Sequence, residues 1–145
     1  MEIRKLSDSS ERTVARINEL LDMLNPEHPL LSHERLETVL ASPETTVFVA
    51  VSDDGCIAGM LSLLRCRCIF GDKFWIEDVV VDSAYRGHGI GRLLVEAAKD
   101  EAASLGGHCI ELTSNPSRPA ARKLYLSAGF VPYETGVFKF YLHRM

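Results

Sequence analysis

Glycine alternates with larger residues at one point of the chain, and this spacing favours an anion-binding turn. The run is Arg86-Gly87-His88-Gly89-Ile90-Gly91-Arg92, and it directly follows Val79-Val80-Val81-Asp82-Ser83-Ala84-Tyr85. Glycine lets the backbone adopt positive φ angles and approach a ligand closely. The first N–H groups of a helix have no partner inside the helix and lie at the positive end of its dipole. The run therefore predicts a pyrophosphate site, to which Arg86 and Arg92 add positive charge.

Two other phosphate-binding loops are excluded by the same spacing. The run lacks the G-x-G-x-x-G pattern of dinucleotide-binding domains, and no acidic residue ends a second parallel strand about 20 positions further on. It also lacks the Gly-Lys-Ser/Thr sequence of nucleotide-binding P-loops. A purely structural turn is the alternative interpretation, but alternating glycines would lower helix stability there without any local benefit.

A second polar segment carries a tyrosine on a predicted helix. It reads Thr113-Ser114-Asn115-Pro116-Ser117-Arg118-Pro119-Ala120-Ala121, continues through Leu124-Tyr125 and ends at Gly129-Phe130. Together with Arg86-x-x-Gly89-x-Gly91, it resembles the CoA-binding motifs of the GNAT superfamily of N-acetyltransferases, whose pyrophosphate signature is Q/R-x-x-G-x-G/A. The resemblance is specific over residues 75–130 and extends in layout over the whole chain.

The resemblance implies acetyl-CoA as co-substrate and a set of residues that bind it. Backbone amides of Arg86, Gly87, His88, Gly89, Ile90, Gly91 and Arg92 would hold the pyrophosphate. Val79, Val80 and Val81 would pair with the pantetheine arm like an extra strand, beside a β-bulge that this family has in that strand. The family's asparagine lies seven residues before its tyrosine, where this chain has Arg118, and the asparagine is found earlier, as Asn115. Both residues are therefore candidates for CoA binding, Arg118 through the 3′-phosphate or the substrate. We expect no metal site.

Aminolysis of a thioester requires a base for the amine, a hydrogen-bond donor for the oxyanion and an acid for the leaving thiolate. Tyr125 matches the family's tyrosine, and a phenol is a suitable donor to a thiolate. A backbone N–H near Val80 or Val81 is the candidate oxyanion donor. Glu77 is the candidate base, in preference to Asp78. Only one of the two is chosen, because alternate residues of a strand face opposite sides and at most one of them can face the cleft. A core aromatic and a structural carboxylate are the alternative interpretations of Tyr125 and Glu77.

Hydrophobic periodicity and capping residues predict the elements that position these residues. We expect strands at 3–6, 45–51, 56–67, 74–81, 108–113, 130–133 and 137–142. We expect helices from an N-cap within Ser9-Ser10-Glu11 to Leu24, after Ser32, at 90–105 and at 117–128. Asp53-Asp54-Gly55 indicates a hairpin turn. This order predicts an α/β (α+β) fold with a mixed, mostly antiparallel central sheet. The resemblance adds helices on both faces and a splayed CoA-binding cleft between two central strands. We expect residues 1–145 to form a single N-acetyltransferase domain.

Composition and charge limit the classes of partner and the cellular location that we expect for this chain. The chain has 145 residues and a formal net charge of -4, without the basic surplus typical of nucleic-acid binders. No apolar run reaches the roughly 18 residues of a membrane span, and no secretory signal is evident. The four cysteines (Cys56, Cys66, Cys68 and Cys109) lack zinc-site spacing. We therefore expect a cytoplasmic protein with reduced thiols that binds neither nucleic acid nor membrane.

The resemblance predicts an acetyl-CoA-dependent N-acetyltransferase that acetylates a primary amine by direct transfer. The length and second segment are most similar to small-molecule enzymes of the aminoalkylphosphonate and glucosamine-6-phosphate type, whose anionic amines could be held by Arg65, Arg67, Lys73 or Arg118. A protein Nα- or lysine acetyltransferase and a non-catalytic acyl-CoA-binding domain are the alternatives. Many relatives are dimers through their C-terminal strands, so a homodimer is also considered, with Val137, Phe138, Phe140 and Tyr141 in the corresponding region.

Overall fold

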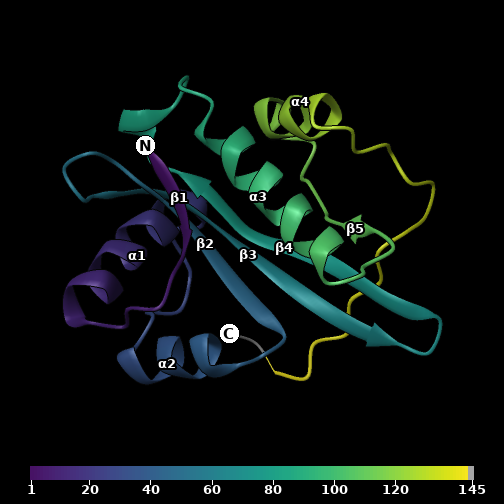
Figure 1. Ribbon diagram of the computed structural model, residues 1–145, viewed down its shortest axis with the longest axis horizontal. Helices are drawn as coiled ribbons and strands as arrows, with labels where there is room; N and C mark the ends of the chain where they lie inside the picture. The colour runs from purple at the N-terminus through teal and green to yellow at the C-terminus, as the bar shows by residue number, and fades with distance from the viewer. Residues whose placement is uncertain (144–145) are drawn as a thin grey trace. The chain divides into compact units, whose positions relative to one another are not determined.

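The chain divides into two compact units, Met1–Thr113 and the residues from Ser114 onward, in a computed structural model that describes residues 1–143. The first unit contains a five-stranded sheet whose strands lie in chain order (Figure 1). The strands are β1 (Glu2–Lys5), β2 (Thr45–Val51), β3 (Ile57–Cys68), β4 (Gly71–Val81) and β5 (Ile110–Glu111). β1 to β4 pair antiparallel, and β5 pairs parallel to β4. The predicted mixed, mostly antiparallel α/β fold is confirmed.

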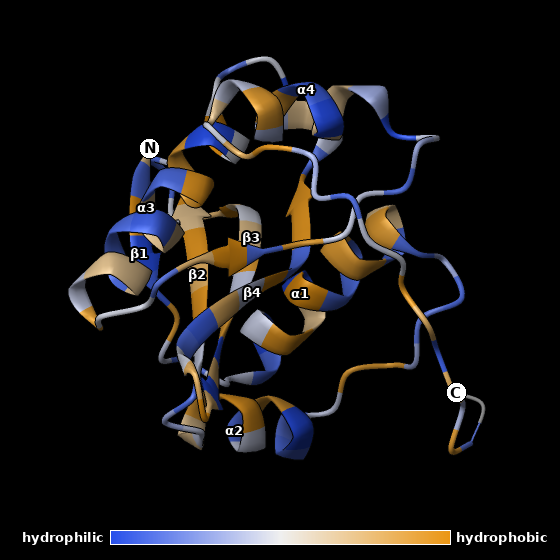
Figure 2. Cartoon of the chain, turned by 90° about the vertical axis from the view of Figure 1, so that its right-hand side faces the viewer, coloured by the Kyte–Doolittle hydropathy of each residue, from blue (hydrophilic) through white to orange (hydrophobic). Residues whose placement is uncertain are grey.

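Helices cover both faces of this sheet. α1 (Glu11–Leu24) lies on one side and α3 (Ile90–Ser104) on the other (Figure 2). Residues of α1 and of α2 (His33–Ala41) share one hydrophobic core with the side chains of β2, β3 and β4 that face them, namely Ile17, Leu20, Leu36, Val47, Val49, Val51, Met60 and Val80. We call this side of the sheet the α1/α2 face.

The opposite face holds α3 very close to β3. A Cβ atom at Gly59 would lie 3.0 Å from the Val80 carbonyl oxygen and 3.4 Å from side-chain atoms of Ile90 and Leu94. Gly59 therefore allows the first turn of α3 to sit directly on the sheet. Because the glycine run leads into this turn, its position relative to β4 is fixed by packing.

Local signals placed most elements correctly. Ser10 caps α1 by accepting a hydrogen bond from the Thr13 N–H, and Ser32 caps α2 through the Arg35 N–H. Gly55 has a φ of 86° in the predicted hairpin turn. β5 is shorter than predicted, since only Ile110 and Glu111 form ladder pairs with β4.

The second unit contains α4 (Pro119–Ser127) and an extended C-terminal segment. The strands predicted at 130–133 and 137–142 are wrong, because the described residues after Gly129 form no strand. A strand exists only through its hydrogen bonds to a neighbour, and residues 130–143 make no such ladder. The apolar side chains after Phe130 are instead exposed, Phe138 to 99% and Phe140 to 87%.

No helix among residues 1–143 is both long enough and apolar enough to span a bilayer.

Candidate functional site

β4 has one edge that is only partly paired. β3 covers its other edge along almost the whole strand. β5 pairs with it only at Phe74–Ile110 and Trp75–Glu111. Within the described part of the first unit, residues 76–81 of β4 therefore have no strand partner on the β5 side. Such an edge offers backbone N–H and C=O groups to an extended ligand.

Hydrogen bonds at the end of β4 show which residues face this open edge. The Asp82 N–H donates to the Ala58 carbonyl oxygen across the β3–β4 pair, at 2.8 Å. Because these bonds alternate along an antiparallel strand, the backbone of Val80 faces β3 and that of Val81 faces the open edge. Arg86 Nε donates to the Val81 carbonyl oxygen there, at 3.2 Å. Of the two candidate oxyanion donors, the Val81 N–H is thus the one on the open edge.

A β-bulge interrupts β4 just before this edge. Met60 pairs with Val80, but Ser62 pairs with Glu77, so Leu61 opposes both Asp78 and Val79. Asp78 has a φ of 55°, in the left-handed region that non-glycine residues rarely adopt. A bulge bends a strand and ends regular pairing, and the stretch paired with β5 ends at Trp75, three residues before Asp78.

The bulge also changes where the two carboxylates of β4 lie. Ser62 faces the α1/α2 core, since it pairs with the core residue Val47. Glu77 pairs directly with Ser62 and therefore shares its face. The Ser62 hydroxyl donates to Asp78 Oδ2 at 2.8 Å, so the Asp78 carboxylate lies on that face as well. The expectation that only one of the two acids can face a given side is wrong, because it assumed regular alternation.

The glycine run forms a turn that leaves the start of α3 open. Asp82 first caps the short helix η1 (Ser83–Tyr85) by accepting from the Ala84 N–H at 2.8 Å. Gly87 and Gly89 then have φ angles of 84° and 76°, and Gly89 is the N-cap of α3 without any side-chain capping bond. A Cβ atom on either glycine would meet nothing within 4 Å. Free space above uncapped N–H groups fits a phosphate.

The other residues of the run are held in place by local contacts. Ile90 is buried and anchors the turn against β3. The exposed His88 ring contacts the Tyr85 carbonyl oxygen at 3.0 Å, and Arg92 Nε donates to Glu96 at 3.1 Å. Arg86 is exposed at the junction of the run with the open edge. Arg86 thus joins the glycine run to the end of β4, whereas Val80 and Ile90 are buried in the core.

Arg16 of α1 binds Asp82, which lies between β4 and the glycine run, and so connects this region with the α1/α2 face of the sheet. The role of Arg16 was not predicted from the sequence. Its guanidinium donates to Asp82 Oδ2 at 2.5 Å, to the Ile57 carbonyl oxygen at 2.9 Å and to Glu19 at 2.7 Å. The hydrogen bond from Arg16 lowers the pKa of the buried Asp82. An acidic residue at the end of a strand was visible in the sequence, but its partner lies 66 positions away.

In the second unit, Tyr125 is buried and packs edge-to-face on Phe130, with ring centroids 5.9 Å apart. Burial raises the pKa of Tyr125, and the positive charge of Arg118 partly opposes this shift. A phenol of ordinary pKa near 10 is protonated at neutral pH, and a raised pKa keeps it so. Tyr125 therefore retains a proton that it can donate.

Asn115 and Arg118 form the start of α4. Asn115 Oδ1 accepts from the Ser117 N–H, and its carbonyl oxygen accepts from the Arg118 N–H, both at 2.9 Å. Arg118 is the N-cap residue, and Pro119 begins the helix, where its missing N–H is not needed. Asn115 is thus a turn-forming residue of the second unit, whatever else it binds.

The basic residues considered for an anionic acceptor already have acidic partners in the first unit. Arg65 and Arg67 both pair with Asp72, at 2.8 and 2.9 Å. Lys73 lies 3.5 Å from Glu111. The three basic side chains are therefore already neutralised by acidic neighbours, as is common for charged residues at a protein surface.

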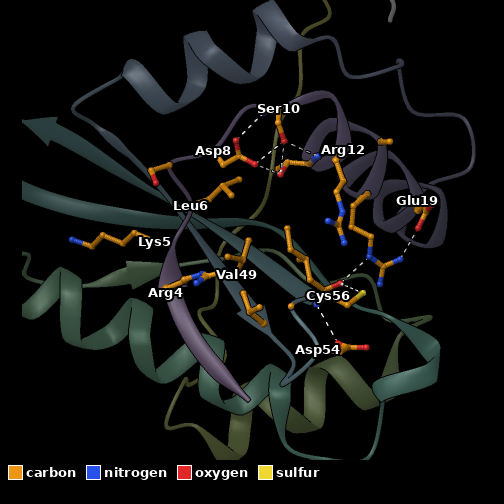
Figure 3. A pocket seen from close by; sticks show the side chains of 17 residues that line it. Arg4, Lys5, Leu6, Asp8, Ser10, Arg12, Glu19, Val49, Asp54 and Cys56 are labelled. Carbon is orange, nitrogen blue, oxygen red and sulfur yellow. Dashed lines mark hydrogen bonds and ion pairs between the residues drawn. The ribbon is translucent and has the colours of Figure 1, made fainter.

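A separate hollow of about 660 Å³ lies between β1, α1 and the turn that joins β2 to β3. Figure 3 shows Asp8 and Ser10 at one end and Asp54 and Cys56 at the other. Asp8 is bonded to Ser10 and Thr13, and Asp54 is bonded to Cys56. No predicted site residue lines this hollow, and its acidic groups are used internally.

The described residues contain no group of three or more histidine, cysteine or acidic side chains placed to hold a metal ion. The first unit offers an anion site, an open strand edge and two carboxylates, and the second unit offers a protonated phenol.

Comparisons with known proteins agree with this geometry. Streptothricin acetyltransferase of Streptomyces lavendulae is 35% identical over 88 residues, which are 60% of this chain and 45% of that protein. The chain thus spans less than half the length of this curated relative. Glucosamine-6-phosphate N-acetyltransferase of Arabidopsis thaliana superposes with a TM-score of 0.81 at 26% identity, covering 97% of each chain. An acetyltransferase of Trypanosoma brucei superposes with a TM-score of 0.77 at 27% identity, covering 97% of this chain and 99% of its own.

The sequence model of the acetyltransferase (GNAT) family matches residues 16–130. This stretch includes the bulged strand, the glycine run and Tyr125. The chain therefore belongs to the acetyltransferase (GNAT) family.

Proposed function

We propose that this acetyltransferase uses acetyl-CoA to acetylate a primary amine of a small molecule by direct transfer. One observation carries the proposal: the open edge of β4 is followed, after η1 and the glycine run, by the uncapped N-terminus of α3. The edge suits an extended amide-containing chain, and the helix end suits a pyrophosphate. A pantetheine arm joined to a pyrophosphate has this order of groups.

The residues predicted from the resemblance then have defined tasks. Backbone amides of residues 86–92 bind the pyrophosphate, and Arg86 supplies a positive charge. Val79 and Val81 pair with the pantetheine amides, while the Val80 side chain anchors the strand in the core. Asn115 and Arg118 are proposed to contribute from the second unit. Residues 1–145 are proposed to act as one domain, since the family match crosses from one unit into the other.

The chemical step needs three groups of this chain. The Val81 N–H stabilises the oxyanion. Tyr125 donates a proton to the departing thiolate, consistent with its raised pKa. A carboxylate of β4 takes the proton of the attacking amine, and the family resemblance assigns this role to Glu77.

A small-molecule acceptor is favoured by the relatives. Two of the relatives described above are named for streptothricin and for glucosamine 6-phosphate. A protein Nα- or lysine acetyltransferase remains the competing activity, and a non-catalytic acyl-CoA-binding domain is the third. A leaving-group acid such as the one proposed at Tyr125 is of use to an enzyme, whereas a binding domain has no need of one.

The test is CoA release from acetyl-CoA over a panel of amines, namely streptothricin, glucosamine 6-phosphate, 3-aminopropylphosphonate, spermidine and peptides with free N-termini. We expect turnover with one small-molecule class. Tyr125→Phe should lower kcat by about 10²-fold or more without changing the Kd for acetyl-CoA. Leu126→Ala, an exposed neighbour on α4, serves as the matched control.

Turnover confined to the peptides would replace the small-molecule proposal by the protein acetyltransferase. Tight acetyl-CoA binding without turnover on any amine would support the non-catalytic domain. Absence of acetyl-CoA binding would refute the proposal altogether.

We propose in addition that the chain forms a homodimer in the cytoplasm. The C-terminal segment carries a cluster of exposed apolar residues, and Val137, Phe138 and Phe140 are 74%, 99% and 87% exposed. Burying such a segment against a second copy would remove this apolar surface from water. The free cysteines suit a reducing compartment. Sedimentation of the wild type should give the dimer mass, and Phe138→Asp with Phe140→Asp should give the monomer; a monomeric wild type would refute the dimer.

A further inference from the structure

The bulge of β4 holds one carboxylate in a fixed place. Asp78 adopts a left-handed backbone conformation, which costs an L-residue about 1–2 kcal/mol. Such conformations persist where the surrounding structure determines them, and they are frequent at functional sites. At Asp78 the surroundings are the flanking β3–β4 pairs and the hydroxyl of Ser62.

Ser62 has no evident reason to be polar other than Asp78. It is only 6% exposed, and it lies among the apolar positions of β3, between Leu61 and Leu63. A buried hydroxyl needs a hydrogen-bond partner, and the Ser62 hydroxyl donates to Asp78 Oδ2 at 2.8 Å. The bond therefore holds the short Asp78 side chain in one position on the α1/α2 face, at the bulge of β4.

This arrangement leaves the second carboxylate oxygen of Asp78 available. The Ser62 hydroxyl donates to Oδ2, and Asp78 is exposed. Among residues 1–143, Asp78 takes part in no ion pair. A carboxylate that is fixed by a neutral hydroxyl and open on its other oxygen is suited to accept a proton. Glu77, by contrast, lies in the regular part of the ladder, opposite Ser62.

We infer that Asp78, in place of Glu77, takes the proton of the acceptor amine, and that Ser62 is its positioning residue. The inference rests on the proposed N-acetyltransferase activity. The neutral amine forms a bond from nitrogen to the thioester carbonyl carbon, and the carbonyl electron pair moves to oxygen. Asp78 Oδ1 takes the proton from that nitrogen. The C=O bond re-forms, the C–S bond breaks with its electron pair on sulfur, and the sulfur takes the proton of Tyr125. Solvent then removes the proton from Asp78 and returns one to Tyr125.

Asp78→Asn is the sharpest test, because asparagine changes little else. Asparagine tolerates the left-handed region, and its amide oxygen still accepts a bond from Ser62. We expect kcat for the best acceptor of the amine panel to fall about 10²- to 10⁴-fold, with the Kd for acetyl-CoA and the unfolding midpoint unchanged. Glu77→Gln should cost clearly less, and Asp100→Asn, an exposed aspartate of α3, serves as the neutral control.

Two further variants separate chemistry from structure. Asp78→Gly relieves the backbone and removes the carboxylate, and added formate should restore part of its kcat. Ser62→Ala should lower kcat about tenfold by itself. In the Asp78→Asn background the same change should have no further effect, because contacting residues that act together are not additive.

Each outcome decides the inference. A loss larger in Glu77→Gln than in Asp78→Asn, an absence of formate rescue, or a Ser62 effect that persists in the Asp78→Asn background would overturn it. If the wild type acetylates no amine of the panel, the proposed function fails and the inference fails with it. That case is recognised before any variant is made.

Discussion

The N-termini of α1 and α3 are built in opposite ways. At α1, Ser10 accepts from the Thr13 N–H and is itself bonded to Asp8. Three hydrogen bonds, the first from Thr13, lower the pKa of Asp8, so a carboxylate of the chain itself occupies that helix end. At α3, the N-cap is Gly89, which has no side chain to bond the free N–H groups.

The difference separates a structural helix end from one kept for a ligand. A capped terminus contributes to folding stability. An uncapped one gives up that contribution and leaves its N–H groups to an anion. Arg16 connects the regions of the two helix ends, since it lies on α1 and binds Asp82, which precedes the glycine run.

The largest expected effect comes from breaking this connection. Arg16→Ala should lower the free energy of unfolding by about 3 kcal/mol, because it leaves the Asp82 carboxylate largely buried without its partner. Urea titration measures the loss. Arg12→Ala, on the exposed side of the same helix, should change stability by less than about 0.5 kcal/mol. Equal effects of the two substitutions would show that the connection is unimportant.

A smaller effect is expected at the open end. Gly89→Val should weaken acetyl-CoA binding roughly tenfold, because a branched side chain disfavours the left-handed region by about 1–2 kcal/mol. Space is not the obstacle, since nothing lies within 4 Å of the added Cβ. Gly89→Asn should weaken binding less, as asparagine tolerates this conformation. Calorimetric Kd values check both, and an equal loss for the two would point to a cause other than backbone strain.

At the closed end, Ser10→Ala should lower the free energy of unfolding by about 1 kcal/mol and leave the Kd for acetyl-CoA unchanged. Thermal unfolding and calorimetry measure the two quantities on the same samples. A clear change in Kd would contradict the division into a structural and a ligand-binding end.

The smallest effect is a pH dependence confined to acid. Arg16 lowers the pKa of Asp82 in the folded state, so this carboxylate stabilises the fold fully above its unfolded value near 3.9. The contribution is lost as the pH falls through the lower folded value. The stability difference between wild type and Asp82→Asn should be constant above about pH 5 and shrink below about pH 4. Urea titrations at several pH values test this, and a difference that stays constant would contradict it.

Much of the fold followed from short-range signals. The capping serines Ser10 and Ser32 and the hairpin glycine Gly55 act within a few residues of themselves, so a sequence displays them directly. The glycine run was equally readable, because positive φ angles at Gly87 and Gly89 depend on the residue type. The C-terminal strands could not be predicted in this way, because the apolar residues around Phe138 and Phe140 form a strand only beside a hydrogen-bonded partner.

Sequence alone determined which residues could bind a pyrophosphate and where most helices and strands begin. Tertiary structure decided the register of β4 on β3, and with it the bulge, the common face of Glu77 and Asp78, and the bond from Ser62. It also brought Arg16 to Asp82. The physical reason is the same in each case: pairing between distant segments has no local signature, and a one-residue change of register moves a side chain to the other face of the sheet.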